Sequence, residues 1–167
     1  MPAAAPAAAT PATPVPLAPA EERAWRALAL AMIRVPRMLE AELEEEHRLT
    51  MAEYFVLVNL SEEPDRALRI TELAERGALS LSGMSRVVDR LSRNGFVERV
   101  KCPSDARGLL AVLTDAGLDK LRSAYATHLR GVRHHVMDHL QGVDLGALAD
   151  ALERFAGDTR TGCGPTA

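Results

Sequence analysis

Three arginines recur at helical spacing in the middle of the chain. Arg86 and Arg90 lie one turn apart, and Arg93 follows seven residues after Arg86, so a helix here aligns three guanidinium groups in one row. Guanidinium groups bind phosphate oxygens and the exposed edges of guanine bases. The alternative interpretation is a solvated helix face on which the arginines pair with acids such as Asp89. The segments around this row favour the first interpretation.

The segment that carries the arginines has an apolar side and a polar side. Ser80 is expected to cap the N-terminus of the helix. Apolar residues then recur at steps of three and four, at Met84, Val87, Val88 and Leu91. The opposite side holds Ser82, Ser85, Arg86, Arg90 and Arg93. Asn94-Gly95 should end the helix, because either residue tolerates the left-handed conformation found there.

A basic hairpin is expected directly after this helix. Residues 96–101, FVERVK, alternate between apolar and polar side chains, which places Arg99 and Lys101 on one face. Residues 102–108, CPSDARG, are typical of a turn, and residues 109–113 return as an apolar strand. Arg107 should lie near the hairpin tip, with Asp105 close enough to orient its guanidinium group. An arginine presented in this way suits a narrow DNA minor groove.

A short helix over ITELAER, at residues 70–76, and a turn through Gly77 precede the arginine helix. The order is therefore that of a helix-turn-helix with a wing. Together, the segments LTMAEYFVL, ITELAE, LSLSGMSRVVDRL and NGFVER, the Asp105-Ala106-Arg107 wing and LTDAG resemble the multiple antibiotic resistance regulator (MarR) family of bacterial transcription factors. The resemblance covers roughly residues 21–157.

This resemblance implies an α-helical homodimer with two winged-helix lobes. Such a dimer binds a pseudo-palindromic double-stranded DNA operator and often releases it when a small effector or an oxidant arrives. By position, the recognition contacts fall on Ser82, Ser85 and Arg86, with Arg90 in support, and the wing contacts on Asp105 and Arg107. The full set of expected DNA-binding residues is Ser80, Ser82, Ser85, Arg86, Arg90, Arg93, Arg99, Lys101, Asp105 and Arg107.

The expected fold class is mainly α with a small β-wing. One domain should span residues 21–156, with the winged helix at about 50–114 and dimerisation helices at about 21–46 and 114–156. Residues 1–20 hold nine Ala and six Pro with no charged side chain, which predicts a disordered tail. Residues 157–167 are expected to be a flexible C-terminal tail.

Two long helices should flank the winged helix. In the first, apolar residues from Trp25 to Leu39 step by three and four, and Pro36 should bend the helix. Thr50 and Glu53 have the spacing of a capping box that starts the next helix. A continuous rod is expected from residue 115 to about Leu140, and a last helix is expected after Asp144. The long rod should carry apolar surface toward a partner subunit.

Composition and charge agree with a cytoplasmic nucleic-acid-binding protein. The whole chain has a net charge of −3, yet residues 66–107 hold nine basic and five acidic side chains, a net of +4. Two cysteines, at positions 102 and 163, do not form a disulfide framework, which fits a reducing cytoplasm. No signal peptide or membrane-spanning run is apparent. A bacterial cytoplasm is expected, with association to the nucleoid when DNA is bound.

The resemblance places an effector in a pocket between the dimer helices and the winged helix, and an aromatic compound is the candidate ligand. Trp25, His47 and Tyr54 are the candidate lining residues, because His47 can titrate near neutral pH and the aromatic rings can stack on a ligand. The alternative is that Trp25 and Tyr54 are core or interface side chains and His47 is solvated.

Other site chemistries find weaker support. His134, His135 and His139 cluster on one predicted helix, but no third ligand for a metal is evident, so no metal or cofactor is expected. Cys102 beside Lys101 could be oxidisable or an ordinary loop thiol. Motifs of phosphate-binding loops and hydrolases are missing, which argues against an enzyme. The alternative to a DNA-binding repressor is a winged-helix module that binds proteins without specific DNA recognition.

Overall fold

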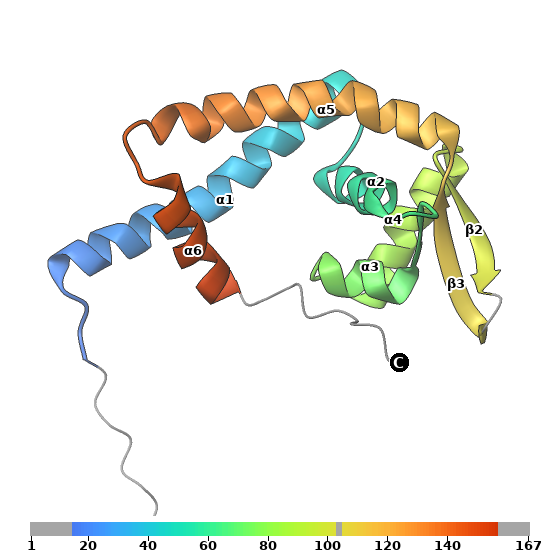
Figure 1. Ribbon diagram of the computed structural model, residues 1–167, viewed down its shortest axis with the longest axis horizontal. Helices are drawn as coiled ribbons and strands as arrows, with labels where there is room; N and C mark the ends of the chain where they lie inside the picture. Colours follow the sequence, from blue (N-terminus) through green and yellow to red (C-terminus); the bar gives the residue numbers. More distant parts are fainter. Residues whose placement is uncertain (1–14, 103–104, 157–167) are drawn as a thin grey trace, which may run out of the picture. The chain divides into compact units, whose positions relative to one another are not determined.

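The computed structural model describes residues 15–102 and 105–156, and at positions 102, 105–107, 155 and 156 it describes the backbone alone. The helices are α1 (Pro19–His47), α2 (Met51–Glu62), α3 (Ile70–Arg76), α4 (Leu81–Arg93), α5 (Asp115–His135), the 3-10 turn η1 (Met137–His139) and α6 (Leu145–Ala156). The strands are β1 (Ala67–Arg69), β2 (Val97–Cys102) and β3 (Asp105–Leu113) (Figure 1). The fold is thus mainly helical with a small antiparallel sheet, which confirms the expected fold class.

Within its described residues the chain divides into two compact units, one up to residue 34 and one from residue 35, and α1 runs through the boundary. In the first unit, α1 begins at Pro19, two residues before the predicted start. The helix also continues past Pro36, which lies inside it. The other elements belong to the second unit, and Leu39 and Leu43 of α1 are buried there.

The second helix begins at the predicted capping box. The Thr50 hydroxyl accepts a hydrogen bond from the Glu53 amide at 3.3 Å, and the Glu53 carboxylate accepts one from the Thr50 amide at 2.9 Å. Arg48, with φ of 54°, provides the left-handed residue between α1 and α2. Val56, Leu57 and Leu60 of α2 are fully buried, so this helix forms the centre of the core.

Helices α3 and α4 pack closely because the turn between them holds a glycine. A Cβ atom at Gly77 would lie 3.0 Å from Phe55 Cε1 and 3.2 Å from Met84 Cε. Ser80 caps α4 as predicted, with its hydroxyl accepting from the Gly83 amide at 3.1 Å. Met84, Val88 and Leu91 are fully buried, and Gly95 takes a φ of 75° where the helix ends. The predicted two-sided helix is confirmed.

The sheet has three strands in the order β1-β3-β2, with both neighbouring pairs antiparallel. Strand β1 was not predicted, because three residues are too few to show an alternating pattern. Strand β3 starts at Asp105, which pairs with Cys102, so the predicted broad turn over residues 102–108 is wrong. The pairing of β2 with β3 is irregular between Lys101 and Cys102.

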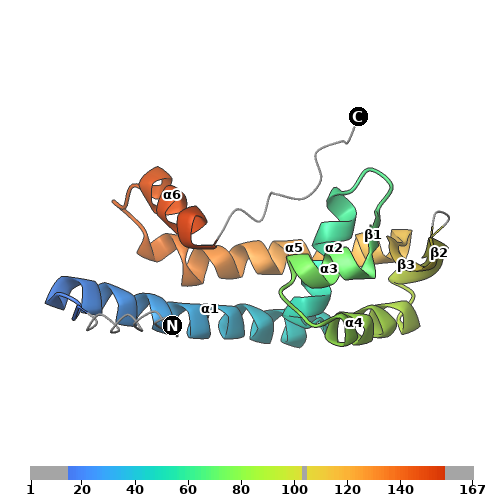
Figure 2. The same cartoon turned by 90° about the horizontal axis from the view of Figure 1, so that it is seen from below.

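Helix α5 presents small residues toward the rest of the second unit. Thr114 caps it by accepting from the Gly117 amide at 3.0 Å, and its buried positions are Gly117, Leu121, Ala124, Thr127 and Gly131. Gly131 permits a close approach of α1, since a Cβ atom there would lie 2.8 Å from Leu39 Cδ2. In Figure 2 the C-terminal part of α1 runs alongside α5.

The predicted continuous rod from residue 115 to Leu140 is wrong at its C-terminal end. Helix α5 stops at His135, and Val136 leaves the helical conformation with φ of −128° before η1 begins. Apolar residues spaced by three fit a 3-10 turn as well as an α-helix, so this spacing did not reveal where α5 ends.

None of the helices in the described part of the chain has the length and hydropathy that a membrane span requires.

The close approach of α5 to the turn before β2 predicts that replacing Gly117 by alanine destabilises the fold. Gly117→Ala should lower the free energy of unfolding by about 1–3 kcal/mol, because the added Cβ would lie 2.1 Å from the Phe96 carbonyl oxygen. Alanine normally favours a helix by about 1 kcal/mol over glycine. Gly146→Ala in α6 is the matched control, since its Cβ meets only the Asp144 side chain, at 3.3 Å. Equal urea midpoints for the two variants would contradict the close packing.

Candidate nucleic-acid interface

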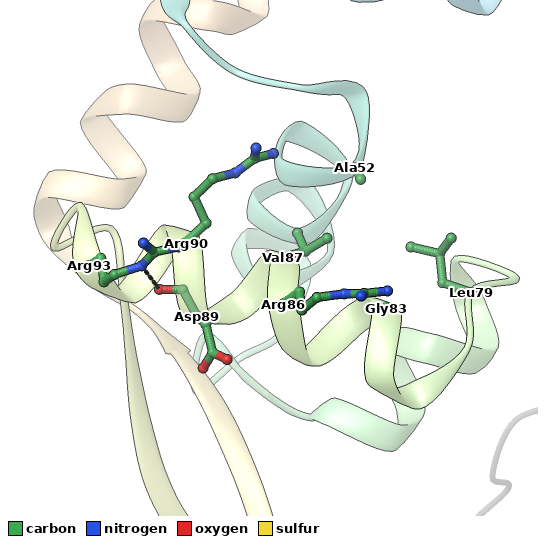
Figure 3. Close-up of a pocket in the computed structure, with 8 residues that line it drawn as sticks. All are labelled: Ala52, Leu79, Gly83, Arg86, Val87, Asp89, Arg90 and Arg93. Carbon is green, nitrogen blue, oxygen red and sulfur yellow. Dashed lines mark hydrogen bonds between the residues drawn. The ribbon is translucent and has the colours of Figure 1, made fainter.

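Helix α4 presents an arginine-lined groove on the side away from its buried residues. The groove has a volume of about 500 Å³ and runs between α4 and the first turn of α2 (Figure 3). Arg86 and Arg93 are exposed, and the Arg93 Nε atom donates to the Asp89 carbonyl at 3.4 Å. The residues that line the groove are Ala52, Leu79, Gly83, Arg86, Val87, Asp89, Arg90 and Arg93. The structure therefore brings the three predicted arginines to one surface.

Arg90 differs from the other two arginines because it is bound within the protein. Its Nε atom donates to Glu53 Oε1 at 2.5 Å, and its NH2 group donates to Thr50 Oγ1 at 2.9 Å. Figure 3 shows the Arg90 side chain reaching from α4 toward the start of α2. Arg90 was predicted as a supporting DNA contact, and pairing of the arginines with acids was the alternative interpretation. The structure pairs Arg90 with Glu53, an acid that helical spacing could not identify because it lies on another element.

A second ion pair joins α4 to the wing. Arg99 of β2 donates to the Asp89 carboxylate, and the Arg99 side chain is only 29% exposed. Lys101, further along β2, is exposed. Arg99 and Lys101 were both predicted as DNA contacts. The structure pairs Arg99 with Asp89 and leaves Lys101 exposed, and DNA binding by either residue remains a prediction.

The wing side chains at the hairpin tip lie outside the described residues. For Asp105 and Arg107 the structure gives the backbone, which belongs to the first three residues of β3, and the same limit applies to Cys102 at the end of β2. The contacts predicted for Asp105 and Arg107 and the possible oxidation of Cys102 therefore remain predictions. Cys163 lies beyond the described residues as well.

A smaller groove of about 230 Å³ lies on the other flank of α4, between α3, α4 and β3. It is lined by Arg69, Ile70, Thr71, Leu81, Ser85, Gly108 and Leu109. Ser85 and Arg86 therefore open onto different grooves, while exposed Ser80 and Ser82 lie at the start of α4, with their hydroxyls 3.2 Å apart. Thr71, an exposed polar residue at this groove, was missed because nothing in its local sequence distinguishes it from a solvated helix residue.

Comparison with known proteins places this arrangement in a family. The MarR family model matches residues 49–109, which contain α2, α3, α4 and much of the wing. Sco3205, a MarR family transcriptional regulator from Streptomyces coelicolor solved in complex with DNA, is similar with a TM-score of 0.80 and 35% identity, over 87% of this chain and 91% of that chain. AbsC, a MarR family regulator from the same organism, is similar with a TM-score of 0.80 and 36% identity, over 89% and 100%. The chain belongs to the MarR family.

A more distant relative, the HTH-type transcriptional repressor YetL of Bacillus subtilis, is 27% identical over 111 residues, 65% of this chain and 66% of that protein. Of the curated relatives that it matches, the chain spans 53% of one and 66% of another. Membership of the MarR family confirms the predicted resemblance. It also confirms, at the level of the family, a transcriptional regulator with a DNA-binding winged helix rather than an enzyme.

Two of the three predicted effector residues of this MarR family chain meet where α1, α2 and α5 pack. His47 Nε2 lies 2.9 Å from Thr127 Oγ1, and Tyr54 is buried with its ring centroid 4.6 Å from that of His128. Trp25 belongs to the first unit and is 55% exposed. Effector binding by these residues remains a prediction.

Acidic residues of α1 complete this junction. The Thr127 hydroxyl donates to Glu46 Oε2 at 2.7 Å, and Arg130 also donates to this carboxylate. These hydrogen bonds, from Thr127 first and then Arg130, lower the pKa of Glu46. His135 Nε2 lies 2.7 Å from Glu42 Oε1, a carboxylate partner that sequence reasoning missed because the two residues are 93 positions apart.

The predicted histidine cluster does not assemble into one site. His135 faces Glu42, while His134 is exposed and its ring centroid lies 4.8 Å from that of His135. His139 lies in η1, beyond the end of α5. In the part of the chain that the structure describes, no group of three or more His, Cys, Asp or Glu side chains is placed to hold a metal ion.

His128 makes folding stability depend on pH. Burial lowers the pKa of His128, against a smaller opposing effect of Glu42. The unfolded chain therefore takes up a proton at about pH 6.5, while the folded state resists it, and the free energy of unfolding should fall as pH decreases below that value. His128→Phe keeps a ring against Tyr54 and should flatten this decline, measured by urea unfolding from about pH 8 to about pH 5.

The exposed His139 supplies the control for this measurement. His139→Phe should leave the pH dependence of the parent protein unchanged. A decline of equal steepness in His128→Phe would assign the pH dependence to other groups.

Proposed function

We propose that this protein is a homodimeric, ligand-responsive repressor that binds a pseudo-palindromic double-stranded DNA operator. The observation that carries the proposal is the polar face of α4, where Arg86 and Arg93 are exposed in one groove and Asp89 joins the helix to Arg99 of the wing. A helix of this kind enters the major groove, where arginine can bind guanine through two hydrogen bonds. Arg107 and Asp105 are proposed to act from the wing at the adjacent minor groove.

The comparisons support DNA binding and, more weakly, repression. Sco3205 was solved in complex with DNA and is 35% identical to this chain over most of both proteins. YetL, at 27% identity, is named a transcriptional repressor. Operator-bound regulators act at the chromosome, so we place the protein in the bacterial cytoplasm and at the nucleoid.

Exposed apolar side chains support the dimer. In the first unit, Trp25, Met32 and Ile33 are each more than half exposed. In the second unit, the exposed large apolar residues from α5 to α6 are Tyr125, Leu129, Met137, Val143, Leu145 and Leu152. Apolar surface of this extent is covered by a partner in stable proteins. Two copies would set the spacing of two α4 helices to about 34 Å, one turn of DNA.

We place the effector at the junction of α1, α2 and α5, where His47 contacts Thr127 and the Tyr54 ring packs against that of His128. A ligand there would contact both the long helices and α2, so its binding energy can change the relation of the winged helix to the dimer. An aromatic compound is the proposed class of effector, because its ring could pack on that of Tyr54.

Arg86→Ala tests the proposed recognition helix. The variant should lose about 1–3 kcal/mol of operator affinity and much of its preference over a scrambled duplex, because one bidentate base contact is removed. The measurement is fluorescence anisotropy with the intergenic DNA beside the protein's own gene. Arg122→Ala, an exposed α5 arginine paired with Asp119, removes the same charge away from the groove. Full discrimination by Arg86→Ala would show that another surface recognises the sequence.

Leu145→Asp in α6 tests the dimer. Leu145 is 51% exposed in one copy, so burying an aspartate there should convert a dimer into monomers and weaken operator binding at least tenfold. Sedimentation velocity gives the oligomeric state. Ala147→Asp, which adds the same charge at an exposed position of the first turn of α6, should remain dimeric. A monomeric parent protein would refute the assembly.

A further inference from the structure

Glu53 is buried, with 2% of its surface exposed, although it lies in the first turn of α2. Its Oε2 atom accepts hydrogen bonds from the Thr50 amide at 2.9 Å and the Thr50 hydroxyl at 3.0 Å. Its Oε1 atom accepts from Arg90 Nε at 2.5 Å. The cap of α2 and the middle of α4 therefore share one carboxylate, across 37 residues of sequence.

A buried carboxylate requires compensation by a charge and by hydrogen bonds. Arg90 provides both, and its second hydrogen bond, to Thr50 Oγ1 at 2.9 Å, fixes the plane of the guanidinium group. The Arg90 side chain is 47% exposed and the Glu53 side chain 3%, so the arginine covers the acid from the solvent side. In this geometry the Arg90 guanidinium group is held by hydrogen bonds to residues at the start of α2.

The Glu53–Arg90 pair restrains the rotation of α4 about its own axis, which the apolar contacts of the helix do not do. Met84, Val88 and Leu91 fix how deeply the helix sits in the core. Rotation about the helix axis is restrained at the edges of that apolar stripe, where Arg90 is held by α2 and the adjacent Asp89 is held by Arg99 of the wing. Base recognition tolerates only small errors in the placement of a side chain.

We propose that Glu53 is a positioning residue for DNA recognition, which acts through Arg90 to hold α4 at the rotation that presents Arg86 to the bases. This inference rests on the proposed function, since it requires α4 to be the recognition helix. The competing interpretation is that Arg90 binds a DNA phosphate and that Glu53 is only an acid nearby.

The two interpretations predict opposite signs for Glu53→Gln. Removing a negative charge beside a DNA-binding surface ordinarily strengthens binding to DNA. Loss of positioning instead weakens binding to the operator, by roughly tenfold, comparable to one mismatched base pair, with little change for a scrambled duplex. Glutamine at this position can still complete the capping box with Thr50, so the start of α2 is preserved.

The experiment measures operator and scrambled-duplex affinities over a salt series for the full chain, with thermal unfolding of each variant. Glu75→Gln, an exposed acid of α3, is the matched control for charge removal and should bind the operator as well as the parent or better. Glu53→Gln that binds the operator as tightly as the parent or more tightly would overturn the proposal.

Arg90→Lys distinguishes a positioning role of Arg90 from direct contact with a DNA phosphate, because the variant keeps the positive charge at this position. Lysine can contact a phosphate, but it cannot donate to Glu53 and Thr50 with the geometry of the guanidinium group. The proposal predicts an operator affinity about as low as that of Glu53→Gln, no further loss when the two changes are combined, and an unchanged salt slope. Parent-like operator binding by Arg90→Lys would overturn it.

The same measurements distinguish failure of the proposed function from failure of the positioning role of Glu53. If Arg86→Ala discriminates between operator and scrambled duplex as the parent does, α4 is not the recognition helix, and the inference falls with that assignment. If Arg86→Ala loses discrimination while Glu53→Gln keeps it, the proposed function stands and the positioning role of Glu53 is refuted.

Discussion

A buried carboxylate at the start of α2 organises the winged helix. Glu53 must be neutralised because its carboxylate is almost fully removed from water, and the Arg90 guanidinium, donating at 2.5 Å, is the group that does so. That requirement fixes α4 relative to α2 from one side. The neighbouring residue, Asp89, binds Arg99 and fixes α4 relative to the wing from the other. Consecutive residues of one helix thus join the three elements that make up the proposed DNA-binding surface.

Close packing by small residues has the corresponding role in α5. Gly117 and Gly131 leave no room for a Cβ atom against the Phe96 carbonyl and Leu39, so α5 lies directly against the turn before β2 and against α1. Larger residues of the same helix, including Tyr125 at 55% exposure, are consequently turned outward. The same helix therefore supports the winged helix with Gly117, Leu121 and Ala124, and it exposes Tyr125 and Leu129 on another side. In the proposed dimer, α5 would therefore connect the subunit interface to the turn before the wing.

Local patterns in the sequence predicted local structure well, but they did not predict contacts between residues that lie far apart in the chain. The Ser80 cap, the buried stripe of α4 and the Thr50–Glu53 capping box each depend on residues within one or two helical turns, and all are confirmed. Strand β1 has only three residues and takes its order from pairing with β3, more than 40 positions away, so it has no pattern of its own. The Glu53–Arg90 and Glu42–His135 contacts join residues 37 and 93 positions apart. Helical periodicity placed Arg90 on the correct face but could not show which acid would meet it.

Internal pairing also changes the electrostatic argument for DNA binding. Residues 66–107 carry a net charge of +4, but acids outside that stretch pair with arginines inside it: Glu53 with Arg90, Glu63 with Arg76 and Asp115 with Arg66. Counting these three acids reduces the local net charge to +1. The number of counterions that DNA binding releases should therefore follow exposed cations that have no ion pair within the described part of the chain, such as Arg86 and Lys101, and not the total number of arginines. A surface with so little excess charge gains less from non-specific phosphate attraction, so more of its operator affinity has to come from contacts with base edges, whose geometry depends on how α4 is held.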